Sequence, residues 1–318
     1  MLNKEIYIWC CDKDLSSGEG QLANLFAKDL VKKKKIIYIN HQILSNKNTI
    51  WHKYMLPLIG IYYCWVKFLE KKEVCFLNYL PLWNCLLFCL LPPKTIFGPI
   101  TGGAISESGY QKLVRSAIFP ILYRISQMFL FFRKTKLIFA TNLLKKNCYQ
   151  FILKKSFWNY QLKKINLTKK YLKKNIDLLI YYRKHSNKET ALIQKVLQKT
   201  HGKKKVFVVG DWLDSQKVQN LGYKNNKKIQ SMLKRTKYSI ISSENIFSFY
   251  TMECINNNVL LIYEKKPSTK IKILNKHFIE IKKFNYKNKL GLNKIYLNKQ
   301  NDILGKINNK TELFYHTE

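Results

Sequence analysis

The chain has 318 residues, 47% of them hydrophobic, which is enough for about two domains of about 150 residues each. This length excludes a small scaffold held together by disulfides. The 57 Lys and Arg residues exceed the 19 Asp and Glu residues and give a formal net charge of +38, which indicates either attraction to phosphates or anionic lipid, or a bias of composition.

The beginning of the chain predicts a cytoplasmic protein. A short hydrophobic run meets Asp12 and Asp14 without a small-residue cleavage site, so we expect no signal peptide. The eight cysteines include no Cys-x-x-Cys pair, and most lie in hydrophobic runs, which is typical of buried thiols in a reducing compartment. These features do not decide whether the protein contacts a membrane.

Strands and helices alternate from the start. Residues 5–11 form a short hydrophobic run typical of a buried strand, and residues 21–33 carry hydrophobic side chains at helical spacing after a turn at 16–20. A second strand is predicted at 36–40. This order predicts a parallel α/β sheet.

Residues 74–91 contain no charge and have the length of a membrane span. Pro81 divides the run into a strand at 74–80 and a buried helix at 82–91, which two prolines end. Another strand follows at 95–100. We therefore favour a buried α/β segment over a membrane span.

Two further segments leave burial and membrane contact as alternatives. Residues 112–136 are hydrophobic on nearly every helical face, which fits either a core helix or insertion into a bilayer surface. Residues 145–174 alternate lysine pairs with aromatic side chains, which fits either a solvated face or contact with anionic lipid.

The second half repeats the alternation. Strands are predicted at 176–182, 206–209, 238–242 and 259–263, and helices at 188–199, 227–235 and 247–256. The fold class predicted is therefore α/β, with two Rossmann-like domains. The predicted limits are a first domain at 1–165, a basic linker at 166–175, a second domain at 176–285 and a peripheral tail at 286–318.

Glycines after two predicted strands are candidate ligand positions, because open parallel sheets bind ligands at the carboxyl ends of their strands. Gly18 and Gly20 precede a helix, where amide groups and the helix dipole favour an anion or a hydroxylated ligand. Gly102 and Gly103 either allow a ligand to approach the backbone or form a tight turn.

Charged side chains in the second half are further candidates. Arg183 and Lys188 follow a predicted strand, and together they suit a diphosphate, although surface charges would look the same. The end of the strand predicted at 238–242 carries Ser243 and Glu244, and Glu253 lies on a hydrophobic helix face. These groups could hold ribose or sugar hydroxyls, and Ser242 or Ser243 could instead cap the helix.

Four segments in chain order, FGPITGG, YYRKHSNK, NLGYKNNKKIQSMLK and SSENIFSFYTMECINNNVLLI, resemble retaining GT-B glycosyltransferases of the group-1 type. The resemblance implies two Rossmann-like domains whose parallel sheets face a central cleft. It also implies an acceptor-binding first domain and a nucleotide-sugar-binding second domain, with no metal or other cofactor. Arg183 and Lys188 match the basic pair on the donor diphosphate, and Glu253 matches the glutamate on the donor ribose.

The match is inexact at the glutamate that the family places near the donor sugar. The family usually separates its two glutamates by seven residues, whereas eight residues separate Glu244 from Glu253. Strict spacing places Asn245 in that role, so either Glu244 reaches the sugar through a bulge or Asn245 contacts it. Tyr182 also replaces the family's usual glycine before the arginine.

The sequence thus predicts transfer of a sugar from a nucleotide-diphosphate donor to a lipid-linked or surface-polysaccharide acceptor at the inner face of the cell membrane. A nucleotide-sugar epimerase of the same fold is one alternative, but its acid and base groups are not evident among the six histidines. A non-enzymatic basic protein that binds nucleic acid is another, but no recognition module is evident. We expect no specific nucleic-acid partner.

Overall fold

The protein consists of two compact units, Met1–Gln161 with Lys310–Glu318 (unit 1) and Leu162–Asn309 (unit 2). The computed structural model describes residues 5–15, 17–31, 34–39, 50–103, 113–133, 135–164, 173–184, 190–202, 204–241, 248–264, 272–286, 300, 302–303 and 305–306, with backbone alone at 50–54, 163–164 and 272–273. The finer domain limits at 165, 175 and 285 stay predictions.

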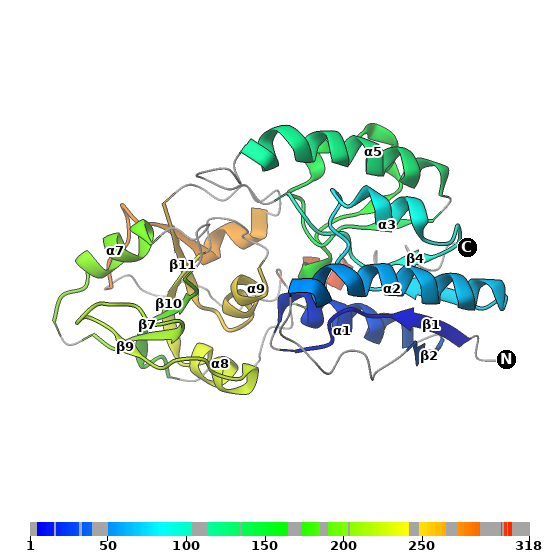
Figure 1. Cartoon of the computed structure of the whole chain (residues 1–318). Helices are drawn as coiled ribbons and strands as arrows, with labels where there is room; N and C mark the ends of the chain where they lie inside the picture. Colours follow the sequence, from blue (N-terminus) through cyan, green and yellow to red (C-terminus); the bar gives the residue numbers. More distant parts are fainter. Residues whose placement is uncertain are drawn as a thin grey trace. The chain divides into compact units, whose positions relative to one another are not determined.

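Unit 1 is built on a parallel sheet with the strand order β2-β1-β3-β4 (Figure 1). The strands are β1 (Glu5–Trp9), β2 (Lys35–Tyr38), β3 (Glu73–Phe76) and β4 (Ile96–Phe97). Just past β4, Ile100 bridges Phe139 in parallel. This bridge connects the sheet to a short parallel pair, β5 (Leu137–Ile138) and β6 (Ser156–Phe157).

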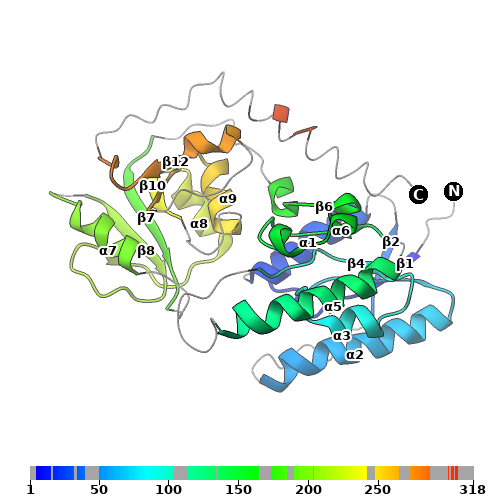
Figure 2. The ribbon, with the colours of Figure 1, turned by 90° about the horizontal axis from the view of Figure 1, so that it is seen from above.

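Helices cover both faces of this sheet. They are α1 (Gly18–Val31), α2 (Ile50–Leu69), α3 (Cys85–Leu90), α5 (Phe119–Phe132), which continues from the π turn η2 (Val114–Ile118), and α6 (Gln150–Lys154). Short 3-10 turns lie at η3 (Lys145–Asn147) and η4 (Tyr160–Lys164). Because right-handed crossovers that run in opposite directions place their helices on opposite faces, α1 lies apart from α2, α3 and α5 (Figure 2).

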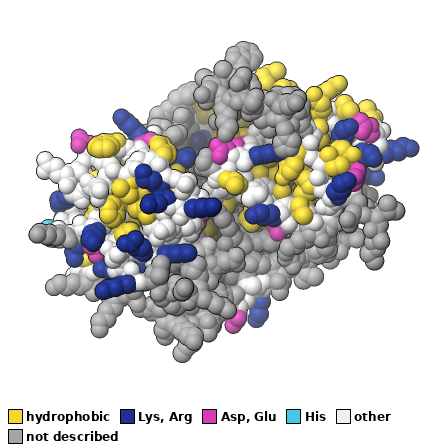
Figure 3. Space-filling model, turned by 90° about the horizontal axis from the view of Figure 1, so that it is seen from below, with side chains coloured by type: hydrophobic (Ala, Val, Ile, Leu, Met, Phe, Trp, Pro, Cys, Tyr) yellow, Lys and Arg dark blue, Asp and Glu magenta, His cyan; other side chains and the backbone are white. Residues whose placement is uncertain are grey.

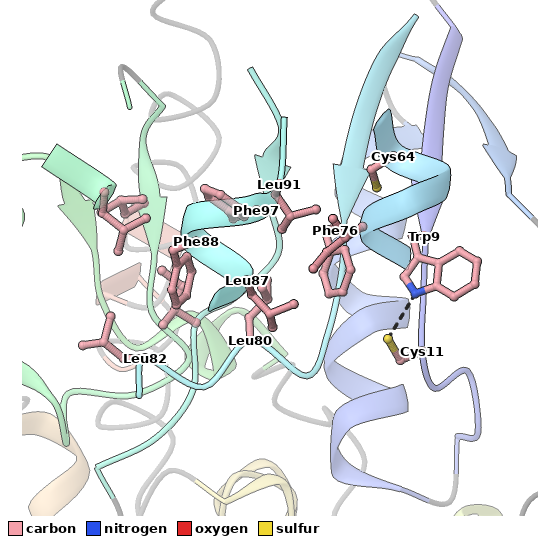
Figure 4. Close-up of a cluster of buried hydrophobic side chains, with 14 of the residues drawn as sticks. Trp9, Cys11, Cys64, Phe76, Leu80, Leu82, Leu87, Phe88, Leu91 and Phe97 are labelled. Atoms are coloured by element: carbon pink, nitrogen blue, oxygen red, sulfur yellow. Dashed lines mark hydrogen bonds between the residues drawn. The ribbon is translucent and has the colours of Figure 1, made fainter. Parts of the chain in front are cut away.

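Aromatic and aliphatic side chains fill the interior between the sheet and α2, α3 and α5 (Figure 4). Trp9 stacks on Tyr63 with ring centroids 5.6 Å apart, and its indole nitrogen donates to the Cys11 sulfur at 3.2 Å. Gly60 of α2 lies against the Trp9 ring, where a Cβ would overlap the indole. Five of the eight cysteines are buried, as predicted, and Cys89 is exposed.

The uncharged run at 74–91 forms a strand and a helix, as predicted, but the helix is not buried throughout. Leu87 and Phe88 are buried, whereas Leu86, Cys89 and Leu90 are exposed. The strand is shorter than expected, since β3 ends at Phe76 and Tyr79 adopts a φ of +55°, which strands do not accommodate. Among the described helices, none is both long and hydrophobic enough to cross a membrane.

The structure decides in part between burial and membrane contact for the two segments that left both open. The region 112–136 forms η2 and α5, whose two faces differ in burial. In the region 145–174, Tyr160 is fully buried, and Trp158 stacks on Phe139 at 4.1 Å. These two rings therefore do not form the lipid-facing surface that the sequence allowed.

Unit 2 contains a parallel sheet with the strand order β12-β11-β10-β7-β8-β9. The strands are β7 (Ile176–Tyr182), β8 (Val206–Gly210), β9 (Gln219–Asn220), β10 (Thr236–Ile240), β11 (Leu260–Tyr263) and β12 (Phe278–Glu280). The helices are α7 (Ala191–Gln198), α8 (Asn226–Leu233), α9 (Phe249–Asn256) and the 3-10 turn η5 (Lys272–His277).

Both faces of this sheet are buried. Leu179 of β7 belongs to one hydrophobic cluster, and its neighbours Leu178 and Ile180 belong to another. Strands buried on both faces are typical of doubly wound parallel sheets. The α/β class and the two Rossmann-like units are confirmed.

On the described part of the face drawn in Figure 3, the basic side chains do not gather in one place. Figure 3 shows Lys and Arg spread over the described part of the face drawn, with hydrophobic side chains between them. A charge spread in this way does not mark a single anion-binding site.

Candidate functional site

The strand order of unit 2 locates its candidate ligand edge. Numbered along the chain within the unit, the six strands follow the order 3-2-1-4-5-6 of the Rossmann fold. The chain adds β8 and β9 on one side of β7 and then adds β10, β11 and β12 on its other side, so the strand order reverses between β7 and β10. Doubly wound sheets bind ligands at the carboxyl ends of the strands that flank such a reversal. Arg183 follows β7 at this edge, and the chain after β10 leads to α9 there.

Arg183 is linked to α9 through two aromatic rings. Its guanidinium lies 5.6 Å from the centroid of the Tyr181 ring, and Tyr181 stacks on Tyr250 of α9 at 5.1 Å. The Tyr250 hydroxyl lies 3.0 Å from the Ser239 hydroxyl and donates to the Leu179 carbonyl. These contacts fix the first turn of α9 against β7 and β10.

The amino end of α9 is capped by Ser248, whose hydroxyl accepts a hydrogen bond from the Thr251 amide at 3.2 Å. This cap is worth about 1 kcal/mol. Ser242 and Ser243 are therefore not the caps of this helix, and that structural alternative was wrong.

Glu253 lies one turn inside α9 and is buried, as the hydrophobic helix face predicted. The pKa of the neighbouring Cys254 thiol is raised to about 12. Burial is the main cause, and the charge of the Glu253 carboxylate adds to it. The same carboxylate contributes to a raised pKa of Tyr250, for which burial is the main cause. A buried carboxylate at this edge is a strong hydrogen-bond acceptor for a hydroxyl group.

Asp211, which was not among the predicted residues, lies beside Arg183 at the end of β8. Its carboxylate accepts hydrogen bonds from the Tyr223 hydroxyl and the Lys184 amide, both at 2.6 Å. These two bonds, with the nearby Arg183 charge, lower the pKa of Asp211. The ionised carboxylate therefore holds the chain just after Arg183 in place.

Gly210 allows this arrangement. It adopts a φ of +110°, and a Cβ there would overlap the Tyr182 carbonyl. Its position directly after a predicted strand, with an acidic residue following, was a signal that could have found Asp211. Tyr250 carried no comparable signal, because its ring differs in no visible way from other aromatics in hydrophobic helices.

Four predicted site residues lie outside the described residues: Lys188, Ser243, Glu244 and Asn245. The choice between Glu244 and Asn245 therefore stays a prediction, as does the pairing of Lys188 with Arg183. Within the described residues, no three His, Cys, Asp or Glu side chains are grouped to hold a metal ion.

Gly18 and Gly20 belong to a helix and not to the turn predicted at 16–20. Gly18 and Gly20 form the first turn of α1, which begins three residues earlier than predicted because the Ser17 hydroxyl accepts from the Gly20 amide at 2.8 Å. The Ser17 hydroxyl in turn donates to the Asp12 carboxylate at 2.5 Å. Asn78, after β3, accepts from the Cys11 amide at 2.8 Å and donates to the Asp12 carbonyl at 2.6 Å.

Gly102 and Gly103 adopt φ angles of +119° and +81°. Both angles fit the tight-turn alternative, since residues with a Cβ rarely adopt them. A Cβ at Gly103 would also overlap the Leu143 backbone. Contact of either glycine with a ligand stays a prediction.

No protein-family model matches the chain, and no curated protein matches it. Among solved structures, HepE from Anabaena in complex with UDP and glucose is similar with a TM-score of 0.47 and 10% identity, over 85% of this chain and 83% of that chain. The glycosyltransferase of kitacinnamycin has a TM-score of 0.44 and 8% identity, over 98% of this chain and 95% of that chain. A calicheamicin glycosyltransferase has a TM-score of 0.42 and 11% identity, over 100% and 99%. At such identities and TM-scores, these likenesses establish neither a family nor an activity for this chain.

Proposed function

We propose that the protein is a glycosyltransferase that binds a nucleotide-diphosphate sugar at the carboxyl edge of the unit 2 sheet. The observation that carries this proposal is the Rossmann strand order, with Arg183 and the amino end of α9 at the point of reversal. The GT-B arrangement, in which both sheets face one cleft, belongs to the proposal.

The chemistry requires stabilisation of a leaving group. As the bond between the sugar and the diphosphate breaks, negative charge develops on the departing nucleotide. A guanidinium fixed beforehand at Arg183 would favour this state over the intact donor. Lys188 would add an ammonium group, and the amides at the start of α9 would add partial positive charge.

Buried Glu253 would accept hydrogen bonds from the ribose hydroxyls, and Glu244 or Asn245 would contact the donor sugar. Ser243 would contribute a hydroxyl near the same place, and Gly18, Gly20, Gly102 and Gly103 would line the acceptor side. Retention of configuration and independence from metal come from the family resemblance. They remain part of the proposal.

The acceptor proposed is a lipid-linked or surface-polysaccharide chain, with the enzyme on the inner face of the cell membrane. The excess of lysine supports binding to an anionic membrane surface, since each lysine near acidic lipid contributes about 1 kcal/mol to the binding free energy.

Donor binding is tested by a thermal-shift screen of UDP-, GDP- and dTDP-sugars against the full chain. Arg183→Ala should weaken the binding of the hit about tenfold to a hundredfold, because a charge-assisted contact to phosphate is lost. Arg235→Ala is the matched control, since this exposed arginine precedes β10 at the opposite end of the strands and its side chain bonds only Asn175 among the described contacts. Its donor affinity should be unchanged.

Glu253→Gln keeps the size of the buried side chain but removes its charge, and it should weaken binding of a nucleotide through the ribose. If the nucleotide sugar raises the melting temperature equally in wild type, Arg183→Ala and Glu253→Gln, the donor binds elsewhere. Product analysis with the hit then separates transfer to an acceptor from epimerisation. Steeply salt-dependent binding of duplex DNA with no response to any nucleotide sugar would contradict the proposal.

A further inference from the structure

Helix α5 and the η2 turn before it expose hydrophobic side chains to solvent. Ile118, Ile121, Ile125, Met128 and Phe132 follow one another at intervals of three or four residues, and all are exposed. Ile121 and Met128 each retain 59% of their accessible surface. Residues at this spacing lie on one side of a helix, so α5 presents a continuous hydrophobic stripe.

The buried side of α5 carries polar residues. Ser126 and Gln127 are completely buried. The Gln127 amide nitrogen donates to the Tyr123 and Asn147 carbonyls, each at 3.0 Å, and its oxygen accepts from the Tyr149 amide at 2.7 Å. These bonds fix the rotation of the helix. A helix of a water-soluble surface normally shows the opposite distribution.

Helices α2 and α3 extend this surface. Leu58, Tyr62, Trp65 and Leu69 are exposed along α2 at the same helical spacing. The Trp65 indole donates to the Leu90 carbonyl at the end of α3, and α3 contacts α5. The three helices lie side by side in both Figure 1 and Figure 2. We call their exposed hydrophobic side chains the apolar face.

The charges around the apolar face are all of one sign within these helices. The sequences of α2, α3, η2 and α5 contain no Asp or Glu, and they contain Lys53, Lys67, Arg115 and Arg124. Glu70, directly after α2, forms an ion pair with Lys67 at 2.8 Å, so Lys67 already has an anionic partner. Arg124 is exposed between Ile121 and Met128. Pairing with a second copy would bring cation against cation with no carboxylate on these helices to offset them.

An anionic lipid surface complements both properties. Hydrophobic side chains enter the boundary between headgroups and acyl chains, and lysine and arginine attract acidic headgroups. Tyr62 and Trp65 have the amphipathic rings that are enriched at this depth.

We propose that the apolar face of α2, α3 and α5 binds the surface of a membrane that contains anionic lipid. Membrane binding by this face is a property of unit 1 and does not depend on the donor site proposed for unit 2. The sequence left burial and insertion into a bilayer surface as alternatives for the region of α5, favoured burial for the region of α3, and gave no indication that α2 takes part.

Flotation with vesicles tests this proposal on the full chain. Wild type should float with vesicles of phosphatidylcholine and phosphatidylglycerol at low salt. The pair Ile121→Gln and Met128→Gln should lower the partition coefficient about tenfold or more, because two side chains no longer gain from burial. Arg124→Gln should lower it about fivefold on these vesicles and leave binding to pure phosphatidylcholine unchanged.

The matched control is the pair Leu15→Gln and Val31→Gln, which retain 54% and 58% of their accessible surface. Leu15 lies in the loop before α1, and Val31 is the last residue of α1. This pair should float like wild type. All variants change exposed side chains, so their melting temperatures should equal that of wild type, which shows that lost flotation is not lost folding.

Wild type that stays unfloated at low salt would overturn the proposal, as would equal losses in the two paired variants. Sedimentation velocity without lipid tests self-association. A wild-type dimer that becomes a monomer in the variant with both Ile121→Gln and Met128→Gln would instead assign the apolar face to self-association. Thermal shift by a nucleotide sugar should persist in this variant, so a failure of membrane binding is distinct from a failure of the donor site.

Discussion

Gly18 and Gly20 stand two residues apart in the first turn of α1, and their surroundings differ. A Cβ on Gly20 would overlap the backbone of Asp14, whereas nothing lies within 4 Å of such an atom on Gly18. The loop after β1 therefore packs directly on the helix at Gly20. This contact holds the Asp12 and Ser17 hydrogen bonds in register.

We expect Gly20→Ala to lower the free energy of unfolding by about 1–3 kcal/mol, since the added methyl group forces a shift of the Asp14 backbone. Gly18→Ala should leave stability unchanged or raise it by up to about 1 kcal/mol, because alanine favours a helix. Urea denaturation of both variants measures the difference. Equal effects of the two substitutions would contradict the close contact at Gly20.

The site residues show which single positions a sequence pattern can find. Arg183 and Glu253 were recognisable because a charge stood out at a strand end or on a hydrophobic helix face. Asp211 also carries a charge at a strand end and was overlooked, whereas Tyr250 could not be found, because its role comes from bonds to residues distant in the chain, such as Leu179.

At the scale of elements, α3 is held by a side chain from the end of α5. The Arg133 guanidinium donates to the Phe88, Leu91 and Pro92 carbonyls at the carboxyl end of α3. Burial lowers the pKa of this group, but an arginine side chain stays charged. A cation suits this end of a helix, where carbonyl groups lack partners.

Arg133→Met should lower the free energy of unfolding by about 3 kcal/mol, because three carbonyls lose a charged donor. Arg124→Met, on the exposed side of the same helix, is the control and should change stability by less than about 0.5 kcal/mol in the absence of lipid. Chemical denaturation compares them. A small effect at Arg133 would show that water replaces the guanidinium.

Elements with strong hydrophobic runs were predictable and short ones were not. Strand β7 and helix α9 lie close to their predicted ranges. The two-residue strand β9 and the strand β12 were not predicted, because Gln219 and Asn220 carry no hydrophobic pattern and pair only through the backbone of β8.

At the scale of the molecule, each unit has its own sheet and its own hydrophobic clusters. We therefore expect two transitions in calorimetry. His277 lies in unit 2 and is completely buried. Burial lowers the pKa of His277 to about 4.

Because the unfolded chain binds a proton at His277 near pH 6.5 and the folded chain binds it only near pH 4, stability falls as the pH drops through this window. At pH 5 the loss should be about 2 kcal/mol relative to pH 7.5. One calorimetric transition should move to lower temperature, and His277→Gln should reduce this movement. His201→Gln, at an exposed histidine, is the control and should leave the pH-dependent change in transition temperature as it is in wild type. The same change in His277→Gln as in wild type would contradict the assignment of this pH dependence to His277.

The sequence by itself determined the class of the fold. Local hydrophobic runs and their spacing fix which segments become strands and helices, and alternation of the two leads to parallel sheets. It also identified Arg183 and Glu253 as candidates, since each carries a charge in a place where local pattern makes a charge unusual.

Only the tertiary structure decided the order of the strands, and with it the edge where Arg183, Asp211 and the start of α9 meet. Strand order depends on contacts between segments far apart in the chain, such as β7 with β10, which no local pattern encodes. The same reason applies to α5. Its sequence is hydrophobic on nearly every face, and contacts with distant residues determine which side faces outward. These contacts are the packing of Tyr123 and Leu130 in the core and the hydrogen bonds of Gln127 to Asn147 and Tyr149.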